Sequence, residues 1–449
     1  MIIIEKATRV ISRFSPALID RIVKSAASFE LTHHFLNKIE SFQLKKINKL
    51  KNILVIPDIN IGDAVISQTM IAIFHCAFPD VKISYCYQKK AYPLIKTNPY
   101  IDIHFPYFQS IGIPSQKDHE KLMNVLKKNN YDIVFNLCPY FPHKILKTSH
   151  SPVLYPVRMI GEIIRAYSSN RESAHIAHRL DKFSLDLVKK YTQNHVNELY
   201  LQSSHSFPHI FMERALLEKS KTILIELGLT FPSRIVLFNP DTSSVYTLIP
   251  PGLQSDLLAG LAALDSVDYI LMNRGFTFKG IEKKVIDGIP PELQKKIRLL
   301  PKNIDIDIYA ALTDQVDVFI SGDTAPLHIA SAKKYSAGAE NLYKNRTSII
   351  GIFGATSGKI YGYDSFSAEY NSPAQDAPAK VFESQPPCKN LTCIDKAFKN
   401  CKEILCFQEL KPEPIIEFTD DCLKKLNTTA SKSLCSVEDP LSQSIEYKA

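Results

Sequence analysis

The chain has 449 residues, a formal net charge of +8 at pH 7, 45% hydrophobic residues and no Trp. Its length predicts two or three domains, and 22% charged residues exclude wholesale disorder and a collagen-like repeat. No uncharged apolar run approaches the roughly 20 residues of a membrane-spanning helix, and Glu5 interrupts the opening apolar residues before a signal-peptide core forms. We therefore expect a cytoplasmic protein.

Positive charge is concentrated in the first 51 residues, which hold ten Lys or Arg against four acidic residues. Apolar residues recur there at helical spacing, as in Val10, Phe14, Leu18 and Ile22, which predicts amphipathic helices. A basic amphipathic helix can lie on an anionic bilayer, and a helical pair packed on the main body is the alternative. The rest of the chain is close to neutral, so no nucleic-acid partner is expected.

Strands and helices are predicted to alternate from Lys51 onward. Short apolar runs at 52–57, 81–87 and 131–137 are typical of buried parallel strands, and helices are expected at about 64–77 and 116–129. This order indicates a parallel sheet with helices on both faces. The residues that follow, to about 180, show no clear period and are interpreted as irregular surface or as an acceptor-facing loop.

A second alternating block begins near Arg234. Five further strands are predicted at 235–240, 269–273, 297–301, 316–320 and 348–354. Two Rossmann-like halves joined by helices between about 180 and 230 would face a cleft. Ligands of such α/β sheets bind beyond the carboxyl ends of the strands, so the chemistry is sought in the loops there.

The first candidate motif is Asn60-Ile61-Gly62-Asp63, directly after the first strand. A glycine lets backbone amides approach a ligand, and Asp63 is expected at the opening of a helix. Asp63 is then either an ordinary helix cap or a general base in the cleft.

The second motif, residues 321–328, follows the strand that is predicted to end at Ile320. Asp323 or Thr324 is a suitable N-cap and Pro326 suits the first turn, so a helix should begin with its unpaired amides facing the cleft. Such an end binds phosphate, and His328 about one turn later can add a donor or a ring.

A third motif, residues 239–244, is a loop rich in hydroxyl groups. It is interpreted as a phosphate cradle or as a plain polar turn.

Four cysteines cluster near the carboxyl end with the spacing C-x4-C-x7-C-x4-C: Cys388, Cys393, Cys401 and Cys406. Four such thiols permit a metal site, although the spacing is wider than in the usual zinc ribbon. Ordinary buried or surface thiols are the alternative.

Taken in this order, these motifs resemble the ADP-heptose:lipopolysaccharide heptosyltransferases, glycosyltransferase family nine. The resemblance covers about residues 50–410, with the Gly-Asp loop and the Asp-Thr-x-x-x-His segment as its most specific parts. It implies a GT-B-type α/β fold with two Rossmann-like domains facing a cleft. We predict a basic helical extension, an acceptor domain, a nucleotide-sugar domain, and a terminal helix and tail, at 1–50, 51–225, 226–410 and 411–449.

The resemblance also implies an inverting bacterial enzyme of lipopolysaccharide biosynthesis that needs no metal or other cofactor. Asp63, with Gly62 in the same loop, matches the catalytic base. The residues that match donor-binding positions are Thr242, Ser243, Glu282, Asp323, Thr324, Ala325 and His328. The partners implied are a nucleotide-sugar, with ADP-heptose suspected, and a lipid-linked glycan acceptor at the inner face of the cytoplasmic membrane, where residues 1–50 would bind the anionic surface.

Two positions depart from the family pattern. Thr247 stands where members usually have a Lys that holds the phosphates, and Ala325 replaces a usual Gly. Lys279 or Arg274 could compensate for the missing Lys. The alternative function is therefore a catalytically impaired nucleotide-sugar-binding or regulatory protein that retains the fold.

Overall fold

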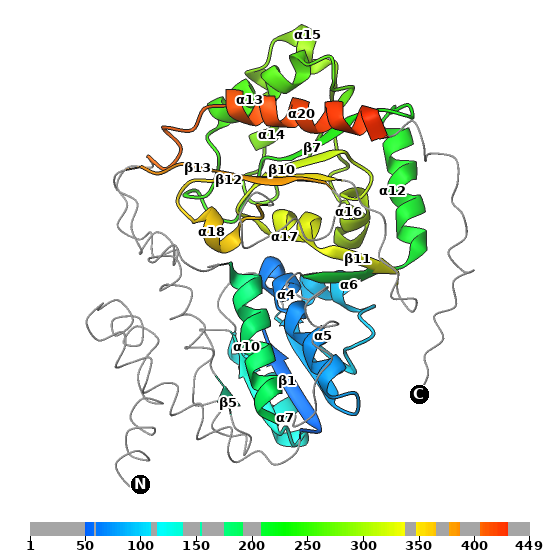
Figure 1. Ribbon diagram of the computed structural model, residues 1–449, viewed down its shortest axis with the longest axis vertical. Coiled ribbons are helices and arrows are strands. Elements are labelled where there is room, and N and C mark those ends of the chain that lie inside the picture. Colours follow the sequence, from blue (N-terminus) through cyan, green and yellow to red (C-terminus); the bar gives the residue numbers. More distant parts are fainter. Residues whose placement is uncertain are drawn as a thin grey trace.

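Two parallel β-sheets, each covered by helices, form the centre of the computed structural model (Figure 1). The structure describes residues 50–57, 60–108, 115–137, 153–154, 175–191, 208–336, 347–364, 377–386 and 405–429. Two α/β halves were predicted, and this architecture is confirmed. Among the described residues no helix is both long and apolar enough to cross a lipid bilayer.

The first sheet has the strand order β3-β2-β1-β4-β5, and all its pairs are parallel. Its strands are β1 (Asn52–Ile56), β2 (Lys82–Gln88), β3 (Ile103–Phe108), β4 (Ile133–Asn136) and β5 (Val153–Leu154). Its helices are α4 (Ile61–Ile66), α5 (Gln68–Ala77), the 3-10 turn η2 (Lys89–Ala91), α6 (Tyr92–Ile95), α7 (Gln116–Lys128) and α10 (Ile176–Tyr191).

The second sheet has the strand order β13-β12-β10-β7-β8-β9. Its strands are β7 (Ile235–Asn239), β8 (Tyr269–Met272), β9 (Ile297–Leu299), β10 (Val318–Gly322), β12 (Ser348–Phe353) and β13 (Ala379–Glu383). Its helices are α12 (Arg214–Glu226), α13 (Pro251–Ala263), α14 (Ile281–Asp287), α15 (Pro291–Gln294), α16 (Ile306–Leu312), α17 (Ala325–Ser331), α18 (Gly358–Tyr361) and α20 (Glu413–Thr429). In Figure 1, α13 and α20 lie on the outer side of this sheet, and α16 and α17 lie on the side that faces the first half.

Both sheets follow the Rossmann strand order, in which the direction of winding reverses between the first and fourth strands. The reversal lies between β1 and β4 in the first half and between β7 and β10 in the second. The loops that follow β1, β7 and β10 therefore occupy the positions where α/β proteins bind ligands.

Acidic residues fasten the starts of the central strands in the same way in both halves. The carboxylate of Asp132, just before β4, accepts the backbone N–H groups of Lys51 and Asn52 at 2.6 and 2.8 Å. The carboxylate of Asp317, just before β10, accepts the N–H of Ile235 at 2.7 Å. Each bond ties the first strand of a half to the strand beside it across the reversal point.

A short parallel ribbon joins the two halves. It pairs β6 (His209–Met212) with β11 (Lys333–Ser336), which follows α17 almost directly. Apolar side chains of β6, α16 and α17 belong to the same buried cluster as the core of the first sheet. The halves are therefore packed together at this side and are not joined by a linker alone.

Several elements differ from those predicted. The helix expected at about 64–77 is two helices, because the chain bends at Ser67, whose hydroxyl donates to the carbonyl of Asp63 at 2.7 Å. The first of these begins at Ile61, which places Gly62 and Asp63 within its first turn. Strands β3, β5, β6, β11 and β13 were not predicted. Residues 1–49, for which amphipathic helices were expected, lie outside the described residues.

Candidate functional site

The two most specific sequence motifs meet where α4 of the first half contacts α17 of the second (Figure 1). A Cβ atom placed on Gly62 would lie 2.8 Å from Cδ2 of His328 and 3.4 Å from Cα of Ala325. The helices approach so closely because position 62 has no side chain. Asp63, the next residue, is thereby held beside the segment that carries Ala325 and His328.

Asp63 lies in the first turn of α4 and is partly exposed. Its Oδ2 atom accepts a hydrogen bond from Nδ2 of Asn60 at 2.9 Å, which orients the carboxylate. The buried Tyr85 of β2 holds α4 in place. Its hydroxyl donates to the carbonyl of Ala64 at 2.7 Å and lies 2.5 Å from Oγ of Ser67. Burial raises the pKa of Tyr85, and the nearby Asp63 raises it further, so the phenol stays protonated.

A polar network connects the loops that follow β7, β8 and β10. Nδ2 of Asn239 lies 3.0 Å from Oγ of Ser321 and 3.2 Å from Oγ1 of Thr324. Oδ1 of Asn239 accepts from Nδ2 of Asn273 at 3.0 Å. This network fixes Thr324, the N-cap of α17, whose side chain makes no capping bond to the helix. Pro326 has no N–H and the N–H of Leu327 donates to the carbonyl of Thr324 at 3.1 Å, so the N–H of Ala325 is the backbone donor that the start of this seven-residue helix offers a ligand.

His328 is buried, and its ring is held by Tyr363. Nδ1 of His328 lies 3.0 Å from the Tyr363 hydroxyl. The ring of Tyr363 also packs against the ring of His175, with 4.9 Å between the ring centroids. Burial raises the pKa of Tyr363, with a further contribution from the buried Asp323. Burial also holds the pKa of His175 well below its usual value, so this ring is neutral. The Cδ2 edge of His328 is left facing α4.

Of the two residues predicted to bind the donor in the hydroxyl loop after β7, one is exposed to solvent. Ser243 is exposed, whereas Thr242 is buried with its Oγ1 atom 2.7 Å from Oγ1 of Thr247. Thr247 is itself only 4% exposed. The position where a lysine was expected therefore forms a buried hydroxyl pair with no charge.

Glu282 shapes the neighbouring loop, residues 273–280. Its Oε2 atom accepts the N–H of Gly275 at 3.0 Å, while the carboxylate of Asp241 accepts the N–H groups of Phe276 and Thr277 at 2.5 and 2.7 Å. A Cβ atom on Gly275 would lie 2.2 Å from the carbonyl oxygen of Phe278, so the loop requires glycine there. The role of Asp241 was not predicted, although it stands in the polar loop that the sequence singled out.

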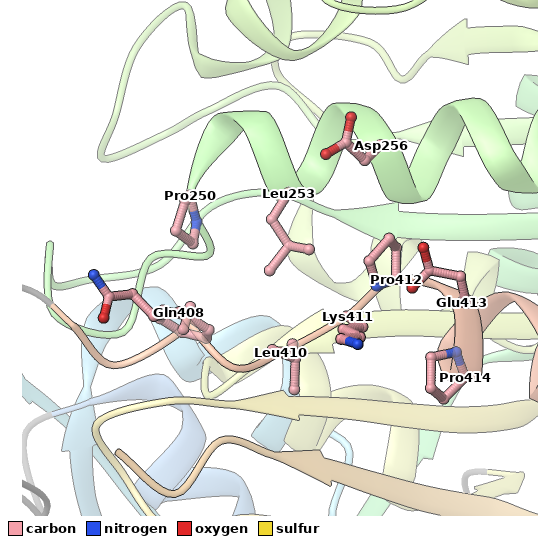
Figure 2. Close-up of a pocket in the computed structure, with 10 residues that line it drawn as sticks. Pro250, Leu253, Asp256, Gln408, Leu410, Lys411, Pro412, Glu413 and Pro414 are labelled. Carbon is pink, nitrogen blue, oxygen red and sulfur yellow. The ribbon is translucent and has the colours of Figure 1, made fainter. Parts of the chain in front are cut away.

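A hollow of about 730 Å³ lies apart from this junction, between the start of α13 and the segment that leads into α20 (Figure 2). It is lined by Pro250, Leu253, Asp256, Phe407, Gln408, Leu410, Lys411, Pro412, Glu413 and Pro414. None of the residues predicted for catalysis or donor binding is among them.

The predicted cysteine site falls mostly outside the described residues. Cys388, Cys393 and Cys401 lie there, whereas Cys406 is described and buried. Within the described ranges no group of three or more His, Cys, Asp or Glu side chains is placed to hold a metal ion.

Comparison with known proteins places this geometry in a structural class. No family model matches the sequence. A family nine glycosyl transferase from Veillonella parvula superposes with a TM-score of 0.58 at 17% identity, covering 84% of this chain and 98% of that one. The E. coli ADP-heptose LPS heptosyltransferase II superposes with a TM-score of 0.57 at 13% identity, covering 84% and 99%. The chain has the GT-B-type fold of these glycosyltransferases.

A protein that is similar in sequence is also named as a glycosyltransferase. A Haemophilus influenzae protein named "Putative glycosyltransferase" is 21% identical over 290 residues, which are 63% of this chain and 80% of that protein. In this GT-B-type chain Gly62, Ala325 and His328 come together, Asp63 follows Gly62, and Asp323 and Thr324 precede Ala325 in sequence. Oγ1 of Thr242 donates to the carbonyl of Asp323 at 3.4 Å, and Glu282 supports the loop of residues 273–280.

Proposed function

We propose that the chain is a heptosyltransferase-like glycosyltransferase. It transfers a heptose or a related sugar from a nucleotide-sugar donor to a lipopolysaccharide core or a related surface glycan. The observation that carries this proposal is the contact of Gly62 with Ala325 and His328, which sets an oriented carboxylate beside the predicted donor segment. We further propose that residues 51–225 bind the acceptor and residues 226–410 bind the donor.

Asp63 acts as the general base. Its carboxylate takes the proton of the acceptor hydroxyl while that oxygen attacks the anomeric carbon from the face opposite the nucleoside diphosphate. The bond to the diphosphate oxygen breaks, and the configuration of the sugar inverts. Asn60 keeps the carboxylate oriented, and proton removal by a placed carboxylate typically contributes about 10²–10⁴ in rate.

The departing diphosphate is bound without a metal. The exposed hydroxyl of Ser243 and the backbone N–H of Ala325, the first residue of α17, donate to its oxygens. His328 adds a donor through Nε2, the ring nitrogen next to Cδ2. ADP-heptose is the proposed donor, since the solved E. coli protein with this fold is named for it.

Substitution of the base tests the proposal. We expect Asp63→Asn to lower the transfer rate about 10²–10⁴-fold while nucleotide-sugar affinity changes little, because an amide of the same shape keeps the bond to Asn60 but accepts no proton. Transfer is measured with purified protein and ADP-, UDP- and GDP-sugars, and affinity is measured by thermal shift. Asp323→Ala is the matched donor-site variant and should lose the shift. Full transfer by Asp63→Asn would contradict the assignment.

One observation favours a second function, a nucleotide-sugar-binding or regulatory protein without turnover. Thr247 is buried against Thr242, so the loop offers no cation at the position that was expected to hold the phosphates. Donor binding without product formation from any of the three sugars would support this alternative. Product formation by the wild type would eliminate it.

We also propose that the enzyme works at the inner face of the cytoplasmic membrane. The support is the concentration of basic residues before Asn52, together with the lipid-linked nature of the proposed acceptor.

A further inference from the structure

The donor loops described above are poor in positive charge. A nucleoside diphosphate brings at least two negative charges, but the loop after β7 offers the hydroxyl of Ser243 and the negative carboxylate of Asp241. The guanidinium of Arg274 is engaged at the end of β9, where its Nε atom donates to the carbonyl of Leu300 at 3.1 Å. If this site binds a diphosphate, a counter-charge must come from Lys279 in the neighbouring loop or from another segment.

A lysine of the first half reaches this part of the second half. Nζ of Lys90, in the turn η2 after β2, lies 4.7 Å from the ring centroid of Phe276. The side chain of Phe276 is 68% exposed, and its backbone N–H donates to the carboxylate of Asp241. Asp241 is the residue before Thr242 in the hydroxyl loop. The ammonium group of Lys90 therefore contacts a loop that Asp241 ties to the loop of Ser243.

The same turn borders the candidate base. η2 contacts α4, the helix of Asp63, so Lys90 lies on the side of the first half that faces the donor loops. Lys90 is exposed, and its four-carbon side chain lets the charge move by several ångström. Attraction between exposed charges acts over about 8 Å at physiological ionic strength.

We propose that Lys90 is a donor-binding residue that neutralises the diphosphate from the acceptor side of the cleft, with the ring of Phe276 holding it in position. The inference rests on the proposed function. It makes neutralisation of the donor depend on both halves, because the cation and the hydroxyl loop belong to different halves.

The experiment measures binding of ADP, UDP and GDP to full-length protein by calorimetry at about 50 and 200 mM salt. Lys90→Met is compared with Lys90→Arg, which keeps the charge. Lys89→Met is the matched control, because it removes the same charge from the neighbouring exposed position. Lys279→Met tests the other exposed lysine of the Phe276 loop, and adenosine, uridine and guanosine serve as probes without phosphate.

We expect Lys90→Met to weaken diphosphate binding about fivefold, with a smaller salt dependence, unchanged nucleoside binding and an unchanged melting temperature. Lys90→Arg should restore most of the affinity. Equal diphosphate binding by Lys90→Met and wild type would overturn the inference on Lys90 and leave the proposed function intact. An equal loss of affinity in Lys89→Met or Lys279→Met would do the same. If the wild type bound none of the three diphosphates, the proposed function itself would fail and this inference with it.

Discussion

Gly62 is the residue on which the contact between the halves depends. We expect Gly62→Ala to lower the free energy of unfolding by about 1–3 kcal/mol, because the new Cβ atom would lie 2.8 Å from the buried His328 ring. Denaturant unfolding measures this, with transfer activity as a second readout.

The matched control for that change is Gly252→Ala in α13. A Cβ atom there meets nothing within 4 Å, so alanine should be neutral or stabilising by about 0.5–1 kcal/mol. Equal effects of the two substitutions would show that Gly62 is not required for close packing.

Asp317 gives stability a specific dependence on pH. Burial raises the pKa of its carboxyl to about 6, against the bond from Ile235 N–H that lowers it. The folded chain therefore holds a proton that the unfolded chain has already released, so the contribution of this group to stability is lost as pH rises from about 4 to 6.

We expect Asp317→Asn to remove this loss. The variant should be more stable than wild type by about 1–3 kcal/mol at pH 7.5 and close to wild type at pH 4, since asparagine keeps an acceptor for the Ile235 N–H. Urea unfolding of both proteins across this range measures the difference. A difference that did not change with pH would contradict the assignment.

Among the elements, β11 is held by a buried ion pair. Nζ of Lys334 lies 3.2 Å from Oδ1 of Asp314 and donates to the carbonyls of Ile329 and Ala330, at the end of α17. Lys334→Met leaves the carboxylate of Asp314 buried without its cation, and we expect a loss of about 3–5 kcal/mol in urea unfolding. Lys302→Met, at an exposed position, should change stability by less than about 0.5 kcal/mol. A comparable loss in both variants would contradict this view.

The predictability of an element depended on its place in the sheet. The central strands β1, β4, β7 and β10 are buried on both faces, so their sequences are continuous apolar runs that are easily identified. The edge strand β3 contains Pro106, and β11 begins with two lysines, so neither has that pattern. β11 is stabilised by pairing with β6, which lies more than 100 residues away in the sequence.

The sequence also predicted the candidate site only in part. The positions of Asp63 and of the segment around His328 follow from the rule that chemistry lies after the strands, and their proposed roles came from the family resemblance. The contact of His328 with Tyr363 and that of Lys90 with Phe276 depend on packing between distant segments. No local pattern in the sequence indicates either of them.

For the whole molecule, the charge of residues 1–50 leads to a separate prediction. Replacing Lys38, Lys45, Lys46 and Lys49 by Gln should weaken binding to vesicles of anionic lipid, by about 1 kcal/mol for each residue near the surface. Vesicle sedimentation measures this, with neutral vesicles as the control. Unchanged binding would favour a helical pair packed on the main body.

The ribbon of β6 and β11 also determines how the two halves can move. It lies at the end of α17, so His328 is close to a connection between the halves that hydrogen bonds and a shared core hold together. The helix α6, which directly follows the turn of Lys90, contacts β6, so the contact of Lys90 with Phe276 belongs to an element that packs on the same ribbon. We therefore expect Asp63, α17 and Lys90 to keep their relative positions when a ligand enters and leaves the site.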